Sequence, residues 1–228
     1  MDTLTKEQKT SRIAQLACKI IDSISISNKP LILNLGIGIP TAISSYLKNS
    51  KVYIHTENGM LGVGPLAKEG EAHPDLINAG RQPVKETLGC SYFDSVESFG
   101  LIRGGHIDVT VMGAFEVDSN GNVANWIIPN GEQLGVGGAM DLLCGAKTVI
   151  IAMTQKTSTG PKMVKKCSLP LTGVRKINFV VTEYGVFSFK DGCYILTIIA
   201  EDCTLEELRN MTEIYFKVSD DLQVLTFQ

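Results

Sequence analysis

The sequence has little excess charge of either sign and no charged tract. Its 21 lysines and arginines against 24 aspartates and glutamates give a formal net charge of −3, and the densest basic spot is the pair Lys165–Lys166. Surfaces that bind nucleic acid need a basic patch or stripe. We therefore expect no nucleic-acid partner, although backbone amides and one or two cations could still hold a small anionic ligand.

Cysteine and histidine are sparse and scattered. The six cysteines include no C-x-x-C pair, and the 228 residues contain only three histidines. Metal centres and disulfide frameworks depend on closely or regularly spaced ligands. We expect no metal site and no disulfides, and reduced thiols are typical of the cytosol.

Long apolar runs are also missing. No segment has the length and composition of a membrane span, and the first 15 residues lack the apolar core of a secretory signal. We expect a cytoplasmic protein that does not bind membranes. The chain has no repeat, low-complexity tract or evident linker, so we predict one domain over residues 1–228.

The residues that are present predict an α/β protein. Thr5 and Gln8 have the spacing of a capping box ahead of a helical apolar stripe. Residues 31–35 and 51–56 are apolar enough for buried strands, and a helix is expected over residues 40–47 between them. Strand, glycine turn, helix and strand form the unit of a parallel sheet.

The rest of the chain has weaker signals. Residues 58–106 are rich in Gly, Pro, Asn and Asp, which predicts loops and a short helix. Asn120–Gly121, between runs 108–117 and 122–128, indicates a hairpin. Further strands are expected at 147–153, 176–182 and 193–199, and further helices at 138–144 and, capped by Thr204 with Glu207, up to about residue 211.

One carboxylate, Glu57, follows the second predicted strand and begins the glycine-rich segment ENGMLGVGP. Open α/β sheets bind ligands at the carboxyl ends of their strands. A carboxylate fixed there could attack a bulky electrophile and form a covalent intermediate. Amides at the later glycine turn, ahead of a helix, could stabilise the resulting oxyanion. The alternative is that Glu57 pairs with a lysine and the glycines only form turns.

A dinucleotide site is a second interpretation. Gly36-x-Gly38 follows a strand, and Glu57 lies about 20 residues later, as that fingerprint requires. However, Thr41 occupies the third glycine position, and Pro40 removes an amide donor. A nucleotide-binding oxidoreductase therefore stays as an alternative, which NAD binding would test.

Three further residues attract attention but are expected to be structural. His55 is two residues before Glu57, on the same face of the strand, and we expect it to support the carboxylate rather than transfer protons. We expect His106 to satisfy backbone groups and Trp126 to pack in the core.

Several segments together resemble the family I coenzyme A transferases. Besides ENGMLGVGP they are, in the family's order, NLGIGIP, HPDLINAG, FDS…LIRGGHIDVTVMGA, ANWIIP, GVGGAMDL and KKCSLPLTG. The resemblance covers about residue 12 to residue 220 and is closest to the small β chains of bacterial acetate/acetoacetate and 3-oxoacid enzymes. It implies an open, mostly parallel α/β sheet with helices on both faces, the coenzyme A transferase (ribose-phosphate-isomerase-like) fold.

The resemblance also implies site residues. Glu57 would be the catalytic nucleophile. Positions that would bind coenzyme A are Asn34, Gly36, Gly38 and Arg81, the last where relatives often have Lys or Gly. Amide donors near the reacting carbonyl would be Gly137, Gly138 and Ala139. Ile198 departs from an L-T-E-I segment of many relatives, and we expect a change in a local surface or subunit contact.

The implied activity is a ping-pong transfer of coenzyme A between an acyl-CoA and a short-chain carboxylate or 3-oxoacid. It would pass through acyl-anhydride and glutamyl-CoA intermediates. Coenzyme A would be a substrate rather than a bound cofactor, and a homologous alpha subunit would complete the site. An acyl-CoA hydrolase and a non-catalytic ligand sensor are alternatives. The residues leave open which acids are exchanged and whether the assembly is a heterodimer or a heterotetramer.

Overall fold

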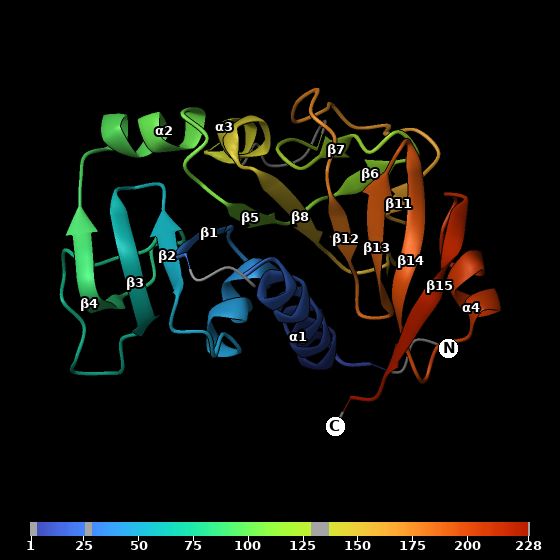
Figure 1. Cartoon of the computed structure of the whole chain (residues 1–228), viewed down its shortest axis with the longest axis horizontal. Coiled ribbons are helices and arrows are strands. Elements are labelled where there is room, and N and C mark those ends of the chain that lie inside the picture. Colours follow the sequence, from blue (N-terminus) through green and yellow to red (C-terminus); the bar gives the residue numbers. More distant parts are fainter. Residues whose placement is uncertain (1–3, 26–28, 129–136, 228) are drawn as a thin grey trace.

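The computed structural model describes residues 4–25, 29–128 and 137–227 (Figure 1). A ten-stranded sheet runs through this part of the chain. Its five central strands are parallel to one another; in spatial order they are β12 (Phe179–Val181), β8 (Thr148–Ala152), β5 (Val109–Met112), β1 (Leu31–Leu35) and β2 (Val52–Thr56). The expected open α/β sheet is confirmed.

Antiparallel strands extend the sheet on both sides. Beyond β2 lie β3 (Met60–Leu66) and β4 (Val84–Tyr92). Beyond β12 lie β13 (Gly185–Lys190), β14 (Cys193–Ala200) and then β15 (Phe216–Leu225), which is parallel to β14. The predicted strands at 147–153, 176–182 and 193–199 are confirmed as β8, β12 and β14, whereas β13 and β15 were not predicted.

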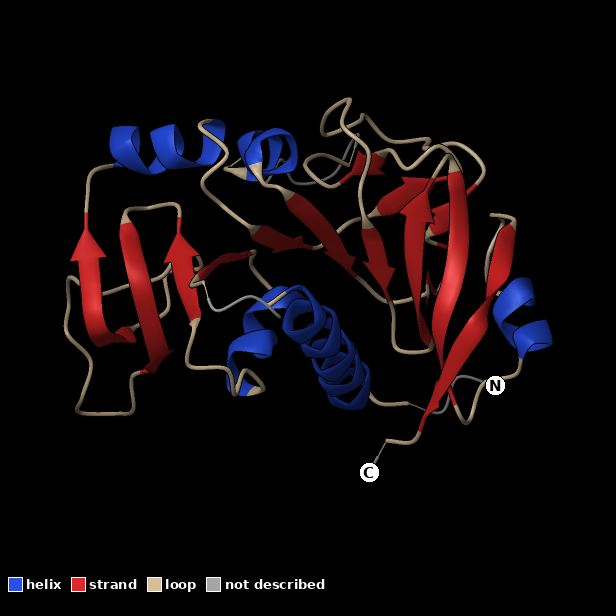
Figure 2. Cartoon of the chain, viewed as in Figure 1, coloured by secondary structure: helices blue, strands red, loops and turns tan. Residues whose placement is uncertain are grey.

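Helices cover both faces of the sheet, as Figure 2 shows. One face carries α1 (Lys6–Ile24) and the short η1 (Ile39–Ser45); the other carries α2 (Ser95–Arg103) and α3 (Ala139–Gly145). Alternate residues of β8 divide between the two cores: Val149 and Ile151 pack with the α2–α3 cluster, and Ile150 packs with the α1 cluster. The period of two along a buried strand therefore positions both helix layers.

The predicted terminal helices are confirmed with their caps. In α1, the Thr5 hydroxyl accepts from the Gln8 amide at 3.2 Å and the Gln8 side chain accepts from the Thr5 amide at 2.8 Å. The same reciprocal arrangement joins Thr204 and Glu207 at α4 (Leu205–Asn210). Each cap satisfies two amides that lack partners inside the helix.

The helix expected over residues 40–47 is present as η1, a 3₁₀ helix that ends two residues earlier. Its bonds run from residue i to i+3, as between the Thr41 amide and the Gly38 carbonyl at 3.1 Å. The Ser44 hydroxyl donates to the Thr41 carbonyl at 2.9 Å, a carbonyl that an α-helix would use for its own bonding. Pro40 lacks an amide donor as well.

The expectation of loops over residues 58–106 was largely wrong. The short helix exists as α2, but β3 and β4 form an antiparallel pair with two irregularities in register. The predicted hairpin around Asn120–Gly121 is confirmed in a separate small sheet of β11 (Met163–Val164), β6 (Glu116–Asp118) and β7 (Val123–Ala124). Run 108–117 splits at Gly113 between β5 in the large sheet and β6 in the small one. Two further short strands, β9 (Lys156–Thr157) and β10 (Gly160–Pro161), pair with each other.

Three expectations about single residues need correction. Ile198 is only 5% exposed and belongs to the α1 core, so it changes neither a surface nor a subunit contact directly. Trp126 is half-buried and donates to the Leu171 carbonyl at 3.2 Å, which places it at the edge of the core. His106 is exposed, and its side chain forms no hydrogen bond with backbone groups of the described residues; only its own backbone amide is bonded, to the Leu101 carbonyl at 3.0 Å.

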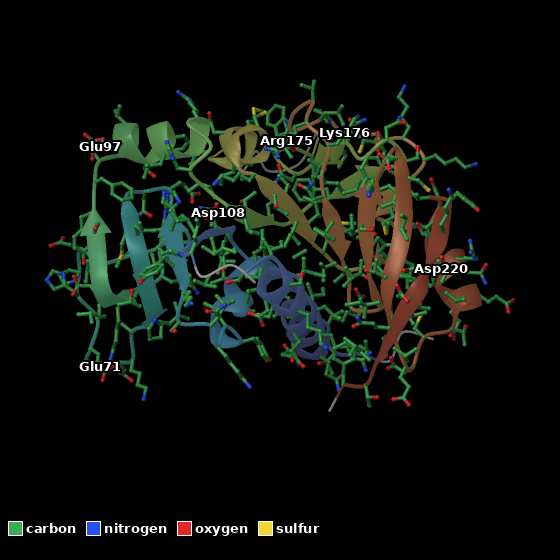
Figure 3. The ribbon with its side chains drawn as sticks, viewed as in Figure 1. Glu71, Glu97, Asp108, Arg175, Lys176 and Asp220 are labelled. Carbon is green, nitrogen blue, oxygen red and sulfur yellow. The ribbon has the colours of Figure 1, made fainter. Side chains whose placement is uncertain are left out.

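The edge of the sheet where the central strands begin is fastened by Asp108, which Figure 3 shows beside β1 and β5. Its carboxylate accepts from the Ile32 amide at 2.8 Å and pairs with Lys147 at 2.6 Å. These contacts join the starts of β1, β5 and β8, so a ligand site is expected at the opposite edge, where these strands end.

In the part of the chain that the structure describes, no helix is both long and apolar enough to cross a membrane.

Candidate active site

Glu57 lies in the tight turn that joins β2 to β3. The Gly59 amide donates to the Thr56 carbonyl at 3.0 Å, and Thr56 pairs with Met60 across the hairpin. Gly59 has a φ of 122°, and a Cβ atom there would clash with the Phe93 carbonyl oxygen. Only glycine fits this position, so the turn holds Glu57 at the carboxyl end of β2.

The Glu57 carboxylate is half-buried and oriented from two sides. Its Oε2 accepts a hydrogen bond from Asn34 Nδ2 at 3.2 Å. On the other side lies Gly138, where an added Cβ atom would be 3.3 Å from Glu57 Cγ and 3.4 Å from Oε1. The absence of a side chain at Gly138 therefore keeps space beside the second carboxylate oxygen.

Asn34 is fully buried and is held at both ends of its amide. The Thr110 hydroxyl donates to its Oδ1 at 3.2 Å, which fixes the NH₂ group toward Glu57. The same nitrogen lies 3.3 Å from the His55 carbonyl and 3.4 Å from His55 Nδ1. Parallel pairing of Asn34 with His55 across β1 and β2 brings these groups together.

His55 is 1% exposed and supports Asn34 from behind. Since Asn34 Nδ2 can only donate, His55 Nδ1 accepts in this contact, and Nε2–H donates to Ser98 Oγ at 3.0 Å. Burial lowers the pKa of His55 from 6.5 to about 4, so the ring is neutral at pH 7. The Phe93 ring stacks on it at a centroid distance of 6.0 Å.

Glu57 faces a cavity of about 550 Å³, within the usual range of about 300–1,000 Å³ for small-molecule sites. Its walls come from the carboxyl ends of β1, β5 and β8 and from the start of α3; they include Asn34, Gly36, Met112, Asn125, Gly138 and Met153. Asn125 is fixed by Thr172, whose hydroxyl donates to Asn125 Oδ1 at 2.7 Å, and by its own bond to the Gly113 carbonyl at 3.2 Å. A fixed carboxylate thus borders a mainly apolar, ligand-sized space.

Residues 28–209 match the sequence family described as coenzyme A transferase. The chain belongs to the coenzyme A transferase family. It is 41% identical over 219 residues to one subunit of the probable succinyl-CoA:3-ketoacid coenzyme A transferase of Bacillus subtilis (strain 168), covering 95% of this chain and 98% of that one. It is 47% identical over 193 residues to the beta subunit of the acetate CoA-transferase of Escherichia coli (strain K12), covering 84% and 88%.

A solved structure extends the comparison to the fold. The acyl-CoA transferase YdiF of Escherichia coli O157:H7 superposes with a TM-score of 0.72 at 19% identity. The match covers 95% of this chain but only 43% of that one. The expected coenzyme A transferase fold is thereby confirmed, and family membership displaces the dinucleotide-binding alternative.

Several residues that the family resemblance singled out meet at the cavity. Its lining contains Asn34, Gly36, Glu57 and the segment 137–139. Gly137 is exposed with a φ of 49°, and Gly138 is the N-cap of α3. The first amides of a helix have no partner inside it, so this segment can present donors to the space beside Glu57.

Two of the proposed coenzyme A positions lie elsewhere. Gly38 is exposed, has a φ of 89° and lies outside the described lining of the cavity. Arg81 is exposed in a turn, with a φ of 61° and its amide bonded to the Asn78 carbonyl at 2.9 Å. It is likewise outside that lining. A role for either residue in binding coenzyme A stays a prediction.

Four side chains at this site were not predicted from the sequence: Ser98, Thr110, Asn125 and Lys162. Thr110 and Ser98 act through Asn34 and His55, and Asn125 and Lys162 line the cavity. Asn125 and Thr110 lie in segments that carried the family resemblance, so those segments were a signal. Lys162 lies just outside such a segment, and nothing in the adjacent sequence predicted a role for it.

Within residues 4–25, 29–128 and 137–227, no group of three His, Cys, Asp or Glu residues could hold a metal ion.

Proposed function

We propose that this chain is the glutamate-bearing subunit of a coenzyme A transferase and that Glu57 is its nucleophile. The observation that carries the proposal is the orientation of the Glu57 carboxylate. One oxygen is bound to Asn34, while the other faces Gly138 and the cavity. A carboxylate held in this way can attack without first losing rotational freedom.

The proposed reaction exchanges bonds without metal or nucleotide hydrolysis. A Glu57 oxygen attacks the thioester carbonyl of an acyl-CoA, the carbon–sulfur bond breaks, and coenzyme A leaves as a thiolate. The thiolate then attacks Glu57 Cδ in the mixed anhydride and releases the first acid as a carboxylate. The second acid attacks the glutamyl-CoA thioester, and the same steps run in reverse. Overall, one thioester is exchanged for another, and the covalent intermediates divide a difficult transfer into easier steps.

The surrounding groups would lower the barriers to these steps. Each tetrahedral intermediate carries an oxyanion, and one preorganised donor is worth about 2.7–4 kcal/mol. The amides of Gly138 and Ala139 are the candidates, because Gly138 borders Glu57 directly. Asn34 would keep Glu57 in place when it leaves as a carboxylate.

A partner chain is part of the proposal. The names of the two relatives compared above describe each of them as one subunit of a transferase, and one of them as its beta subunit. This chain spans 43% of the length of the acyl-CoA transferase YdiF, which leaves room there for a second unit of similar size. We propose that a homologous alpha subunit supplies the rest of the coenzyme A site and that short-chain carboxylates or 3-oxoacids are the acids exchanged.

Mass spectrometry of the peptide that contains Glu57 tests the nucleophile. The chain, with and without its alpha subunit, is incubated with butyryl-CoA, succinyl-CoA or acetoacetyl-CoA. We expect a labile adduct on Glu57 in the complex and little turnover by the chain alone. Glu57→Gln should lose the adduct and on the order of 10³-fold or more in kcat.

The matched control is Glu97→Gln, a change of the same size at an exposed residue on α2 (Figure 3). It should leave the adduct and the rate unchanged. An active complex without an adduct, or an active Glu57→Gln complex, would overturn the proposal. Release of free acid without an acceptor carboxylate would instead identify an acyl-CoA hydrolase.

A further inference from the structure

Lys162 is a half-buried cation in the wall of the cavity that Glu57 faces. Among the described residues, no carboxylate forms an ion pair with its ammonium group within 4 Å, and no hydrogen bond to that group is found. Its backbone is well fixed: the Lys162 amide donates to the Gln155 carbonyl at 3.2 Å, and its carbonyl accepts from the Val117 amide at 2.9 Å. The side chain is therefore anchored at its base and open at its tip.

Lys162 and Glu57 approach the cavity from different sides. Glu57 follows β2, whereas Lys162 is bonded to Gln155, shortly after β8. The strand order β8-β5-β1-β2 separates those two ends by three strand spacings, or about 14 Å at ~4.8 Å each. A small acid lying across the ends of β1 and β5 would have one end at Glu57 and the other toward Lys162.

The surroundings of Lys162 favour an anionic ligand. Burial lowers the pKa of Lys162 from 10.5 to about 8, and the negative charge of Glu183 opposes this shift. Glu183 is fully buried and already engaged, since its Oε2 accepts from the Gln155 amide at 2.8 Å and its Oε1 lies 3.7 Å from Lys9 Nζ. At pH 7 Lys162 is mainly charged, and a partly dehydrated ammonium is stabilised when a carboxylate enters beside it.

We propose that Lys162 selects the acid by binding a second carboxylate at its far end, while the near carboxylate reacts with Glu57. The inference rests on the proposed function and gives it a substrate class, the short dicarboxylic acids. Because the order of the strands puts Lys162 and Glu57 on different sides of the cavity, we assign Lys162 to the far carboxylate rather than to the reacting one. The cavity wall between the two sides, with Met112, Ala114 and Met153, suits the methylene groups of such an acid.

Succinate and butyrate form the matched pair of probes, because both have four carbons and only succinate has a second carboxylate. In the complex with the alpha subunit, Lys162→Gln and Lys162→Met should lower kcat/KM for succinate by about 30- to 100-fold. The value for butyrate should change by less than about threefold. Lys162→Arg, which keeps the charge, should restore at least part of the preference for succinate.

Lys176→Gln is the control for the removal of a lysine. Lys176 is exposed on the surface (Figure 3), where it donates to Asn122 Oδ1 at 2.6 Å, and its loss should leave both acids unaffected. The preference of the unaltered enzyme for succinate should decline as the pH rises through about 8, when Lys162 loses its proton. The Lys162→Arg enzyme should keep its preference over the same interval.

Three outcomes would overturn the inference. Equal losses for succinate and butyrate would mean that Lys162 binds coenzyme A or supports the fold. Unchanged kinetics would remove it from the site. A loss confined to acetoacetate, measured as a third acid, would make its ligand a 3-oxo group. Each is distinct from failure of the proposed function, because formation of the Glu57 adduct from butyryl-CoA is measured in the same Lys162 variants.

Discussion

Asn34 connects three strands at the residue from which the chemistry is proposed to start. It lies on β1, accepts from Thr110 on β5, and donates to Glu57 after β2. A hydrogen bond to a charged group contributes about 1.5–3 kcal/mol. This bond exists when Glu57 is a carboxylate, so it helps most in the steps where Glu57 attacks or leaves.

Replacing Asn34 with leucine removes the hydrogen bonds at nearly constant volume. We expect kcat to fall by about 10- to 100-fold, with a much smaller change in KM, because the free carboxylate would sample unproductive rotamers. Steady-state kinetics of the complex with its alpha subunit measure both constants. Thr110→Val, which leaves the Asn34–Glu57 bond in place, should have a smaller effect; an unchanged kcat in the Asn34 variant would contradict the positioning role.

Glu57 could be found from the sequence, whereas Lys162 could not. Glu57 stands between a clear apolar strand and a glycine-rich segment, and both signals are local. Lys162 lies among β9, β10 and β11, which have two residues each and are too short to show periodicity. Its place in the cavity depends on backbone bonds to Gln155 and Val117, and such long-range contacts leave no local pattern.

At the scale of elements, the dipeptide Asn-Gly indicates one of the two hairpins in which it occurs more clearly than the other. Asn120–Gly121 predicted a hairpin that exists, and Asn58–Gly59 ends the turn between β2 and β3. The sequence does not indicate the second hairpin, because β3 contains Gly62, Gly64 and Pro65, which usually mark loops. Much of β4 is exposed, so it lacks the apolar alternation of a half-buried strand.

The turn after Glu57 should be intolerant of any side chain at Gly59. Gly59→Ala combines an unfavourable φ of 122° with a clash against the Phe93 carbonyl, and we expect a loss of at least about 2 kcal/mol in the free energy of unfolding. Gly70→Ala is the control, since Gly70 has a φ of 79° but nothing within 4 Å of an added Cβ atom. It should cost about 1 kcal/mol. Urea unfolding compares the two, and equal losses would show that the contact with Phe93 is unimportant.

At the scale of the whole molecule, one edge of the sheet provides stability and the other provides the site. Asp108 fastens the starts of the central strands, and the cavity lies where the same strands end. Parallel pairing allows this division, because all carboxyl ends then lie at one edge. The position of the site at the carboxyl ends of the strands could be predicted from the first βαβ unit. The contribution to the cavity wall of residues beside the small β6–β7–β11 sheet could not.

Neutral, buried His55 makes the stability of the whole molecule depend on pH. Its pKa is 6.5 in an unfolded chain and about 4 in the folded one. Above pH 6.5 the ring is neutral in both states, and the neutral ring makes its full contribution to the free energy of unfolding. Between pH 6.5 and 4 only the unfolded chain takes up the proton, so folding stability falls as the pH falls.

The full shift corresponds to a loss of about 3 kcal/mol over that interval, at 1.36 kcal/mol per pKa unit. His55→Gln should remove this dependence, because its amide can accept from Asn34 and donate to Ser98 but does not titrate. Urea unfolding of both proteins from pH 7 to pH 4 measures the difference. The free energy of unfolding of the unaltered protein should fall relative to that of His55→Gln as the pH falls, since the unaltered protein alone loses the His55 contribution. Curves that stay parallel would show that His55 titrates equally in both states, and that the neutral ring behind Asn34 does not set the acid limit of the fold.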